Sequence, residues 1–166
     1  KKVVVTCPHC FTTIGRDYKD QGFELTMIHH SQLLNQLVKD GKLKVSPHKQ
    51  GAKITFHDPC YLGRHNQIYQ PPRELLEATG ADLTEMPRNQ ERSFCCGAGG
   101  GRMWQEEKLG TRINLNRVDE ALATGADQIA VGCPFCRIMI SDGVAGRGSE
   151  KEVLDLAQVL LTNIKP

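Results

Sequence analysis

The chain has 166 residues, of which 24% are charged and 39% hydrophobic, and its formal net charge is +2. That length suits one domain of ordinary size, whose core is large enough to fold without disulfides. Because acidic and basic residues are interspersed, no charged block predicts a nucleic-acid partner or a membrane-surface patch. The longest apolar runs are far shorter than the roughly 18 residues of a membrane-spanning helix, and the first residues lack the pattern of a signal peptide. We therefore expect a cytoplasmic segment that does not itself insert into a membrane.

Strands and helices alternate along the predicted chain. The first strand is a β-branched run that ends in a cysteine turn, and Ser31 is a favourable N-cap for the helix after the second strand. Short apolar strands and amphipathic segments then alternate to the end of the chain. The expected elements are, in chain order, strand 2–6, helix 11–19, strand 22–29, helix 32–39, linker 42–52, strand 53–57, helix 73–79, strand 82–86, loop 88–94, helix 103–123 with Gly110 as a break, strand 128–131, helix 137–142 and helix 152–164.

This alternation predicts an α/β fold with a mostly parallel sheet flanked by helices. Cys60 comes soon after the predicted strand 53–57, and Cys133 comes soon after the predicted strand 128–131. The carboxyl ends of parallel strands share one edge of the sheet, which is where α/β folds generally bind ligands. We therefore expect a cysteine cluster at the carboxyl edge of the strands.

The seven cysteines come in Cys-Cys and Cys-x-x-Cys units. In a reducing compartment this spacing favours metal ligation over disulfides, with a redox-active dithiol or buried structural thiols as the alternatives. Five thiolates exceed the four that a tetrahedral zinc ion or an ordinary four-iron cubane takes, so a larger or irregular centre is indicated. Adjacent cysteines diverge in extended backbone, but each can bind a different iron of one cluster. The five are Cys60, Cys95, Cys96, Cys133 and Cys136.

An internal repeat is visible in the sequence. The segments 5–10 and 131–136 both read as a strand end followed by Cys-Pro-x-Cys, and a helix is expected behind each. We therefore predict that residues 1–30 are the remnant of a first repeat, that 31–52 form a helix and linker, and that 53–166 form a complete second repeat. Cys7 and Cys10 would then belong to a remnant site, whose Cys-Cys-Gly segment precedes Lys1 in a longer parent protein.

A glycine-rich run follows the cysteine pair and admits two interpretations. Glycine-rich turns before a helix can bind phosphates, but Arg102 stands where a dinucleotide-binding motif would need its third glycine. We favour a role for Gly97, Gly99 and Gly100 as backbone around a cluster, because residues without a Cβ let amide groups approach its sulfurs.

The histidines and Trp104 are given structural roles. For His57 and His65, near Cys60, a hydrogen bond around the ligands is commoner than ligation or proton transfer, and we expect no histidine ligand. We expect Trp104 to lie in the core rather than to relay electrons. Glu106 and Glu107 are interpreted as helix-surface charges, and no catalytic residue is assigned.

The cysteine pattern resembles the CCG cysteine-rich domain that occurs in heterodisulfide reductase. The same module occurs in the iron-sulfur subunits of anaerobic glycerol-3-phosphate dehydrogenase, glycolate oxidase and lactate-utilisation enzymes. The flanking segments 57–66 and 95–104 look most like a membrane-bound branch similar to electron-transfer flavoprotein:menaquinone oxidoreductases. These proteins usually carry two CCG repeats in tandem, together with ferredoxin-type clusters and transmembrane helices.

The resemblance implies a cofactor and a role. The cofactor would be a noncubane four-iron four-sulfur cluster whose ligands are the five cysteines named above. This segment would be an electron-transfer domain of a larger oxidoreductase on the cytoplasmic face of the membrane, inactive by itself. Electrons would pass from a flavoprotein, the electron-transfer flavoprotein, toward menaquinone.

Two alternatives remain open at this point. One is an iron-sulfur subunit that acts with a heterodisulfide, glycolate, lactate or glycerol 3-phosphate. The other is a structural zinc-binding scaffold without redox chemistry, and the segment purified by itself could hold zinc or no metal.

Overall fold

The computed structural model describes residues 1–46 and 52–164 and contains two parallel sheets. The smaller sheet pairs β1 (Lys2–Val5) with β2 (Thr26–His29). The larger sheet has the strand order β4-β3-β5-β6, and every pairing between its strands is parallel. Its strands are β3 (Lys53–His57), β4 (Asp82–Leu83), β5 (Gln128–Val131) and β6 (Glu152–Asp155). The predicted α/β fold with a mostly parallel sheet is confirmed.

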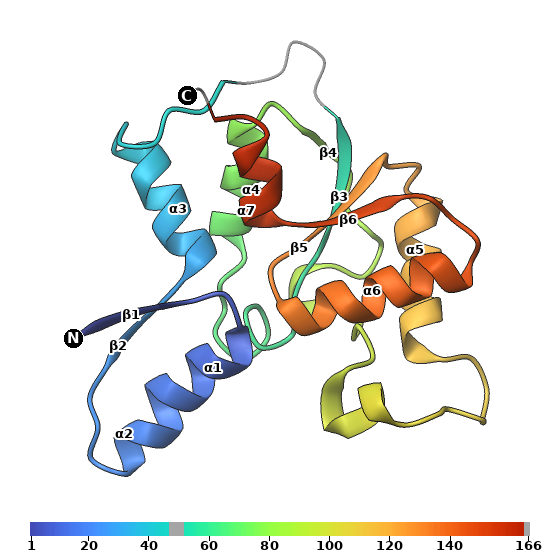
Figure 1. The fold of residues 1–166 in the computed structure, drawn as a ribbon, viewed down its shortest axis with the longest axis horizontal. Helices are drawn as coiled ribbons and strands as arrows, with labels where there is room; N and C mark the ends of the chain where they lie inside the picture. The colour runs from blue at the N-terminus through green and yellow to red at the C-terminus, as the bar shows by residue number, and fades with distance from the viewer. Residues whose placement is uncertain (47–51, 165–166) are drawn as a thin grey trace.

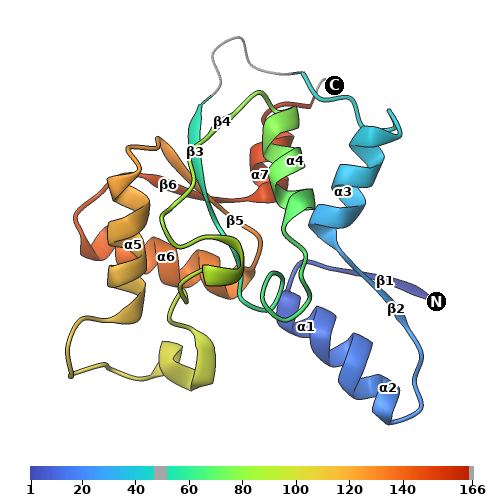
Figure 2. The same ribbon diagram turned by 180° about the vertical axis from the view of Figure 1, so that it is seen from behind.

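Helices cover both faces of the larger sheet. In Figures 1 and 2, α5 and α6 lie on one side of it, and α4 and α7 lie on the other. A π-helical turn (Thr13–Asp17) joins α1 to α2, and short 3-10 turns occupy Gln90–Arg92 and Gly99–Trp104. The α-helices are α1 (Pro8–Thr12), α2 (Tyr18–Asp20), α3 (His30–Lys39), α4 (Gln70–Ala78), α5 (Ile113–Ala123), α6 (Pro134–Gly146) and α7 (Leu156–Leu161). None of the helices in the described ranges is both long and apolar enough to cross a membrane.

The central strand β5 is buried on both faces. Ile129 and Val131 belong to the core cluster under α5 and α6, whereas Ala130 belongs to the cluster under α4 and α7. A strand covered by helices on both sides needs apolar residues where it is buried, which explains the run of three apolar residues after Gln128. Cys133 lies between the end of β5 and the start of α6, so it follows a strand that is buried on both faces.

Close contact between α5 and α6 depends on Gly143. A Cβ built at this position would lie 2.7 Å from Cγ2 of Val118 and 3.2 Å from the backbone oxygen of Asn114. Both atoms belong to α5, and a backbone oxygen cannot rotate away as a flexible side chain can. The absence of a side chain at Gly143 therefore permits the spacing of the two helices.

We expect the Gly143→Ala substitution to lower the free energy of unfolding by about 1–3 kcal/mol, the usual cost of overpacking a core. At an open helix position the same change would stabilise by about 0.5–1 kcal/mol. Urea denaturation measures the difference, with Ser141→Ala on the exposed side of α6 as the control. A Gly143→Ala variant as stable as the parent chain would show that α5 can move away without cost.

The two halves of the chain share one local design. In each, a strand leads through a Cys-Pro turn into a helix and a parallel strand, which ends at the capping residue of a further helix. His29 caps α3 and Asp155 caps α7, each through a reciprocal capping box with a glutamine three residues later. The likeness of the two halves thus extends beyond the Cys-Pro-x-Cys motif.

One imidazole links these two halves. Nδ1 of His29 accepts the hydrogen bond of the Ser31 amide, and its Nε2 lies 3.3 Å from the Thr6 oxygen and 3.1 Å from the Gly132 oxygen. Thr6 and Gly132 directly precede the two Cys-Pro turns. Burial, and then the nearby charge of His30, lowers the pKa of His29 to about 4, so the ring is neutral and donates through Nε2.

Two predicted helices are corrected. The helix over 152–164 is wrong in its first four residues, because Glu152–Asp155 pair in register with β5 and the helix begins only at Leu156. The helix over 103–123 begins only at Ile113, because Gln105 is extended, with φ −118° and ψ 143°, and Gly110, the predicted break, has a positive φ of 69°.

Smaller corrections concern individual residues and bounds. Trp104 is 76% exposed and is not a core residue, and β4 spans only two of the five residues predicted for its strand. Glu107 is not a free surface charge, because it pairs with Arg102 and accepts the Ile113 amide at the start of α5. Positions 47–51 of the predicted linker lie outside the described residues.

Candidate metal centre

The segment after β3 is held by a buried ion pair. Asp58 is 2% exposed, and its carboxylate binds the Arg73 guanidinium of α4 through two hydrogen bonds of 2.8 and 2.9 Å. Arg73 also pairs with Glu85 at 2.6 Å, so its charge is enclosed by two carboxylates. The anchored backbone then turns at Pro59 and presents Cys60 at the carboxyl edge of the sheet.

The same aspartate anchors the loop that carries the cysteine pair. Its Oδ2 accepts the Gln90 amide at 2.8 Å, and its backbone oxygen accepts the Ser93 hydroxyl at 2.8 Å. Cys95 and Cys96 follow directly, Cys95 half-buried and Cys96 4% exposed. Asp58 therefore fixes the positions of Cys60 and of the pair relative to each other.

Gly97 ends this loop in a conformation that other residues rarely adopt. Its φ is +93°, and a Cβ there would lie 3.1 Å from the Asn114 amide nitrogen and 3.3 Å from Cε of Met139. The Gly97 amide donates to Sγ of Cys95 at 3.3 Å. Gly99 and Gly100, by contrast, have open space where a Cβ would stand.

The segment after β5 supplies two enclosed thiols. Cys133 is the N-cap of α6, Pro134 begins that helix, and Cys136 lies in its first turn. Their exposures are 0% and 2%. Amide groups at a helix N-terminus favour negative charge, so this position suits thiolates.

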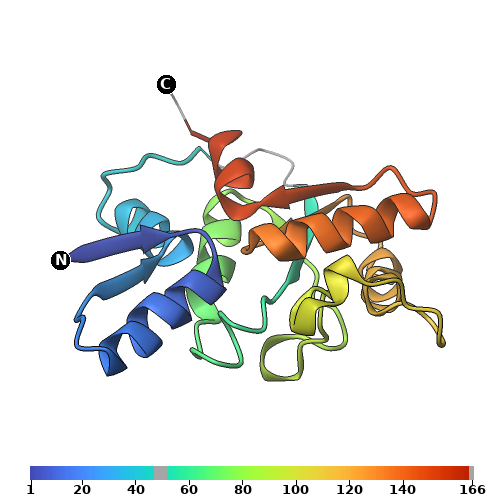
Figure 3. The ribbon, with the colours of Figure 1, turned by 60° about the horizontal axis from the view of Figure 1, so that its bottom comes forward.

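Two groups of metal-binding atoms result. A ring nitrogen of His57 and the Sγ atoms of Cys96 and Cys136 lie within 4.8 Å of one another. The Sγ atoms of Cys7 and Cys133 and a ring nitrogen of His9 form a second group of the same size. Since Cys133 and Cys136 share one helical turn, the two groups adjoin, and Figure 3 shows the N-terminal ends of α1 and α6 facing each other.

The thiols shift one another's pKa values, mainly through hydrogen bonds between them. Hydrogen bonds from Cys136 and Cys95 lower the pKa of Cys96, and a hydrogen bond from Cys136 likewise lowers the pKa of Cys133. In return, the bond to Cys133 raises the pKa of Cys136. Burial, and then the charge of Cys96, raises the pKa of Cys60. The sulfurs therefore share a limited number of protons, which bound metal cations would displace.

All five cysteines expected to bind the cluster lie at this edge, and Cys7 joins them. Cys7, which the sequence predicts at a separate remnant site, has its sulfur beside that of Cys133, and their hydrogen bond raises the pKa of Cys7. Cys10, expected at the same remnant site, is exposed. The parallel placement of Cys7 and Cys133, each as the N-cap before a Pro, is the sequence signal that could have suggested this proximity.

The sequence did not reveal the residues that position the sulfurs. Asp58, Arg73 and Ser93 support the cysteine segments, and Arg117 of α5 donates to His57. An Arg on an amphipathic helix normally indicates the solvent-exposed face, whereas Arg117 is fully buried. Only the three-dimensional arrangement distinguishes it from the exposed arginines.

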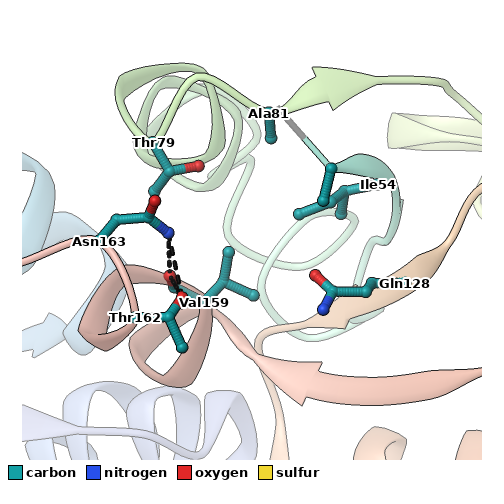
Figure 4. A pocket seen from close by; sticks show the side chains of 8 residues that line it. Ile54, Thr79, Ala81, Gln128, Val159, Thr162 and Asn163 are labelled. Atoms are coloured by element: carbon teal, nitrogen blue, oxygen red, sulfur yellow. Dashed lines mark hydrogen bonds between the residues drawn. The ribbon is translucent and has the colours of Figure 1, made fainter. Parts of the chain in front are cut away.

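A cavity at the opposite edge of the sheet offers no comparable chemistry. It has a volume of about 240 Å³ and lies between α4, α7 and the beginnings of β3 and β5 (Figure 4). Asn163 points into this space and donates to the Val159 oxygen at 2.8 Å. Among the described residues, the side chains that line it include no thiol, imidazole or carboxylate: Ala52, Ile54, Thr79, Ala81, Gln128, Val159, Thr162 and Asn163.

Several named proteins are similar to this chain. The "Probable iron-sulfur-binding oxidoreductase FadF" of Bacillus subtilis is 45% identical over 167 residues, which cover 99% of this chain and 24% of that protein. The "EtfAB:quinone oxidoreductase" of Syntrophomonas wolfei is 43% identical, with 96% of this chain and 24% of that protein covered. One component of the dihydromethanophenazine:CoB--CoM heterodisulfide reductase of Methanosarcina barkeri is 36% identical, with 96% and 40% covered.

This chain spans about a quarter of the length of the first two relatives. The sequence model of the CCG family, described as a cysteine-rich domain, matches residues 54–141. That match contains all five of the cysteines expected to bind the cluster and more than half of the chain, so the resemblance drawn from the cysteine pattern is confirmed. The chain belongs to the CCG family of cysteine-rich domains.

Proposed function

We propose that this chain is the iron-sulfur electron-transfer domain of a larger oxidoreductase. The observation that carries the proposal is the convergence of sulfurs from three separate segments, after β3, before α5 and after β5, at one largely buried edge of the sheet. The donor set fits such a cofactor, because thiolates are soft ligands that select iron-sulfur clusters and zinc over hard cations. A surplus of thiols over the four of a zinc site favours the cluster.

The proposed ligands are Cys60, Cys95, Cys96, Cys133 and Cys136, and the proposed centre is a noncubane four-iron four-sulfur cluster. Such a cluster supplies one-electron redox chemistry. The chain supplies the thiolates, keeps water from the buried sulfurs, and directs the Gly97 amide at Cys95. Gly99 and Gly100 are proposed to keep the adjoining backbone free of side chains.

The direction of electron flow is proposed from the names of the relatives. A quinone oxidoreductase that acts with EtfAB supports transfer from an electron-transfer flavoprotein toward menaquinone, with the parent protein at the cytoplasmic face of the membrane. A heterodisulfide reductase component among the relatives keeps the related disulfide chemistry as the second candidate. In either case we propose that residues 1–30 are the C-terminal remnant of a first CCG repeat and that 53–166 form a complete second repeat. Both halves share the same strand, cysteine turn and capped helix.

Anaerobic reconstitution with iron and sulfide tests this function. We expect about four irons per chain and a reducible, EPR-active centre. Cys96→Ser should weaken iron binding by about tenfold or more, because it replaces a buried thiolate by a harder and less acidic donor. Iron and acid-labile sulfide are counted by chemical analysis, and the centre is followed by EPR.

Cys10→Ser is the matched control, since Cys10 is exposed and its loss should leave the iron content unchanged. One equivalent of zinc after anaerobic purification, with no uptake of iron, would favour the structural scaffold and contradict the proposal. Equal iron binding by Cys96→Ser and the parent chain would remove Cys96 from the ligand set.

A further inference from the structure

His57 lies among the sulfurs of the candidate centre. It is the last residue of β3 and is 1% exposed, and one of its ring nitrogens is within 4.8 Å of the Sγ atoms of Cys96 and Cys136. An imidazole in this place can either bind a metal through an unprotonated nitrogen or donate an N–H to sulfur. The choice depends on which nitrogen carries the proton.

Arg117 determines that choice. Its Nε donates to Nδ1 of His57 at 3.0 Å in a fully buried contact. A guanidinium has only donors and stays protonated in proteins, so Nδ1 must present its lone pair. The neutral ring therefore carries its proton on Nε2, and this buried donor has no hydrogen-bond partner, sulfur included, among the described residues. A protonated Nε2 cannot bind a metal.

Arg117 is itself rigidly held. It is 0% exposed, and its Nη1 donates to Glu120 at 2.6 Å and to the backbone oxygen of Arg88 at 2.8 Å. Glu120 also pairs with the Arg88 side chain, which keeps the carboxylate in place from the other side. The contacts from Glu120 through Arg117 to His57 thus connect α5 with the sulfurs. They hold the imidazole in one orientation.

We propose that His57 donates an Nε2–H hydrogen bond to sulfur at the Cys96–Cys136 end of the centre, and that Arg117 is the positioning residue that fixes this tautomer. His57 is then a donor beside the centre rather than a ligand of it. The inference rests on the proposed function for its redox consequence, whereas the tautomer itself does not. A donor to cluster sulfur stabilises the added negative charge of the reduced state, so the bond raises the reduction potential.

The potential of the reconstituted chain tests the redox consequence. His57→Phe should retain the full iron content and shift the midpoint potential to a more negative value. Arg117→Met should shift it in the same direction, and the double variant should show no larger shift than His57→Phe, because Arg117 acts through the ring. His65→Phe, which alters an exposed histidine stacked on Tyr61, is the control and should leave the potential unchanged.

Three results would contradict the proposal, and each contradicts a different part of it. Loss of iron from a folded His57→Phe chain would identify His57 as a ligand, and an unchanged potential at full iron content would deny the hydrogen bond. Additive shifts in the double variant would show that Arg117 acts by its own charge.

A second measurement does not need the cluster or a folded variant. In the metal-free parent chain with ¹⁵N-labelled histidine, two-bond ¹H–¹⁵N correlation spectra report the tautomer of each ring. We expect His57 to be neutral with the proton on Nε2, and the Nδ1–H form or a charged ring would overturn the inference. If the chain binds no iron but shows this tautomer, the proposed function fails while the role of Arg117 stands.

Discussion

Arg73→Met is expected to lower the free energy of unfolding by about 3–5 kcal/mol, the usual result of removing one partner of a buried ion pair. Methionine keeps most of the aliphatic volume, so the loss comes from the charge. Without Arg73, the Asp58 carboxylate, 2% exposed, keeps the Gln90 amide as its hydrogen-bond donor among the described residues. Chemical denaturation of the metal-free chain measures the effect.

Arg147→Met provides a matched control, because Arg147 makes a bidentate pair with Asp119 at the surface, with distances of 2.7 and 2.6 Å. Exposed pairs of this kind contribute about 0–1 kcal/mol. The two variants share the same substitution and each removes a bidentate pair, but the pair at Arg73 is buried and the pair at Arg147 lies at the surface. Equal losses of stability would mean that the enclosure of Asp58 has no energetic importance.

Gly97→Ala is expected to destabilise the chain by at least about 1–2 kcal/mol from its backbone conformation, with a further cost of about 1–3 kcal/mol from crowding. The new Cβ would stand 3.1 Å from a backbone nitrogen of α5, which cannot give way as a side-chain end can. Because Gly97 directly follows the cysteine pair, the strain should also displace Cys95 and Cys96. Denaturation of the metal-free chain and iron content after reconstitution measure the two effects.

Alanine substitutions at two other glycines separate the cost of the backbone conformation from the cost of crowding. Gly110 has a φ of +69° with open space at the Cβ position, so its change to alanine should show the conformational cost alone. Gly99 has neither a positive φ nor a close neighbour, and Gly99→Ala should leave the stability of the metal-free chain unchanged. A Gly97→Ala variant no less stable than Gly110→Ala would show that the contact with α5 relaxes freely.

The sequence was sufficient to predict the parallel sheet and the edge at which the cysteines gather. Apolar runs such as 129–131 end just before cysteine segments, and parallel strands place such ends together. The four residues of β6 were predicted as helix because their pattern fits either element and their register depends on β5. Asp155 followed by Gln158 is a capping-box signal that places the helix start correctly.

The supporting contacts of the site could not be predicted in this way. Asp58 meets Arg73 across fifteen positions of the chain, and His57 meets Arg117 across sixty. Nothing local distinguishes either arginine from a surface one, because burial depends on the packing of whole helices against the sheet. Spacing therefore indicates candidate ligands, whereas their orientation becomes known only from the tertiary structure.

The imidazole of His29 bears on where this molecule can be divided. A cut at the start of the proposed second repeat, just before β3, would look natural from the sequence. It would nevertheless remove the donor to the Gly132 oxygen, the His30 partner of Asp155 at 3.0 Å, and the Cys7 sulfur beside Cys133. The boundary between the proposed repeats is therefore not a boundary for truncation, and the smallest transferable module includes residues of both halves.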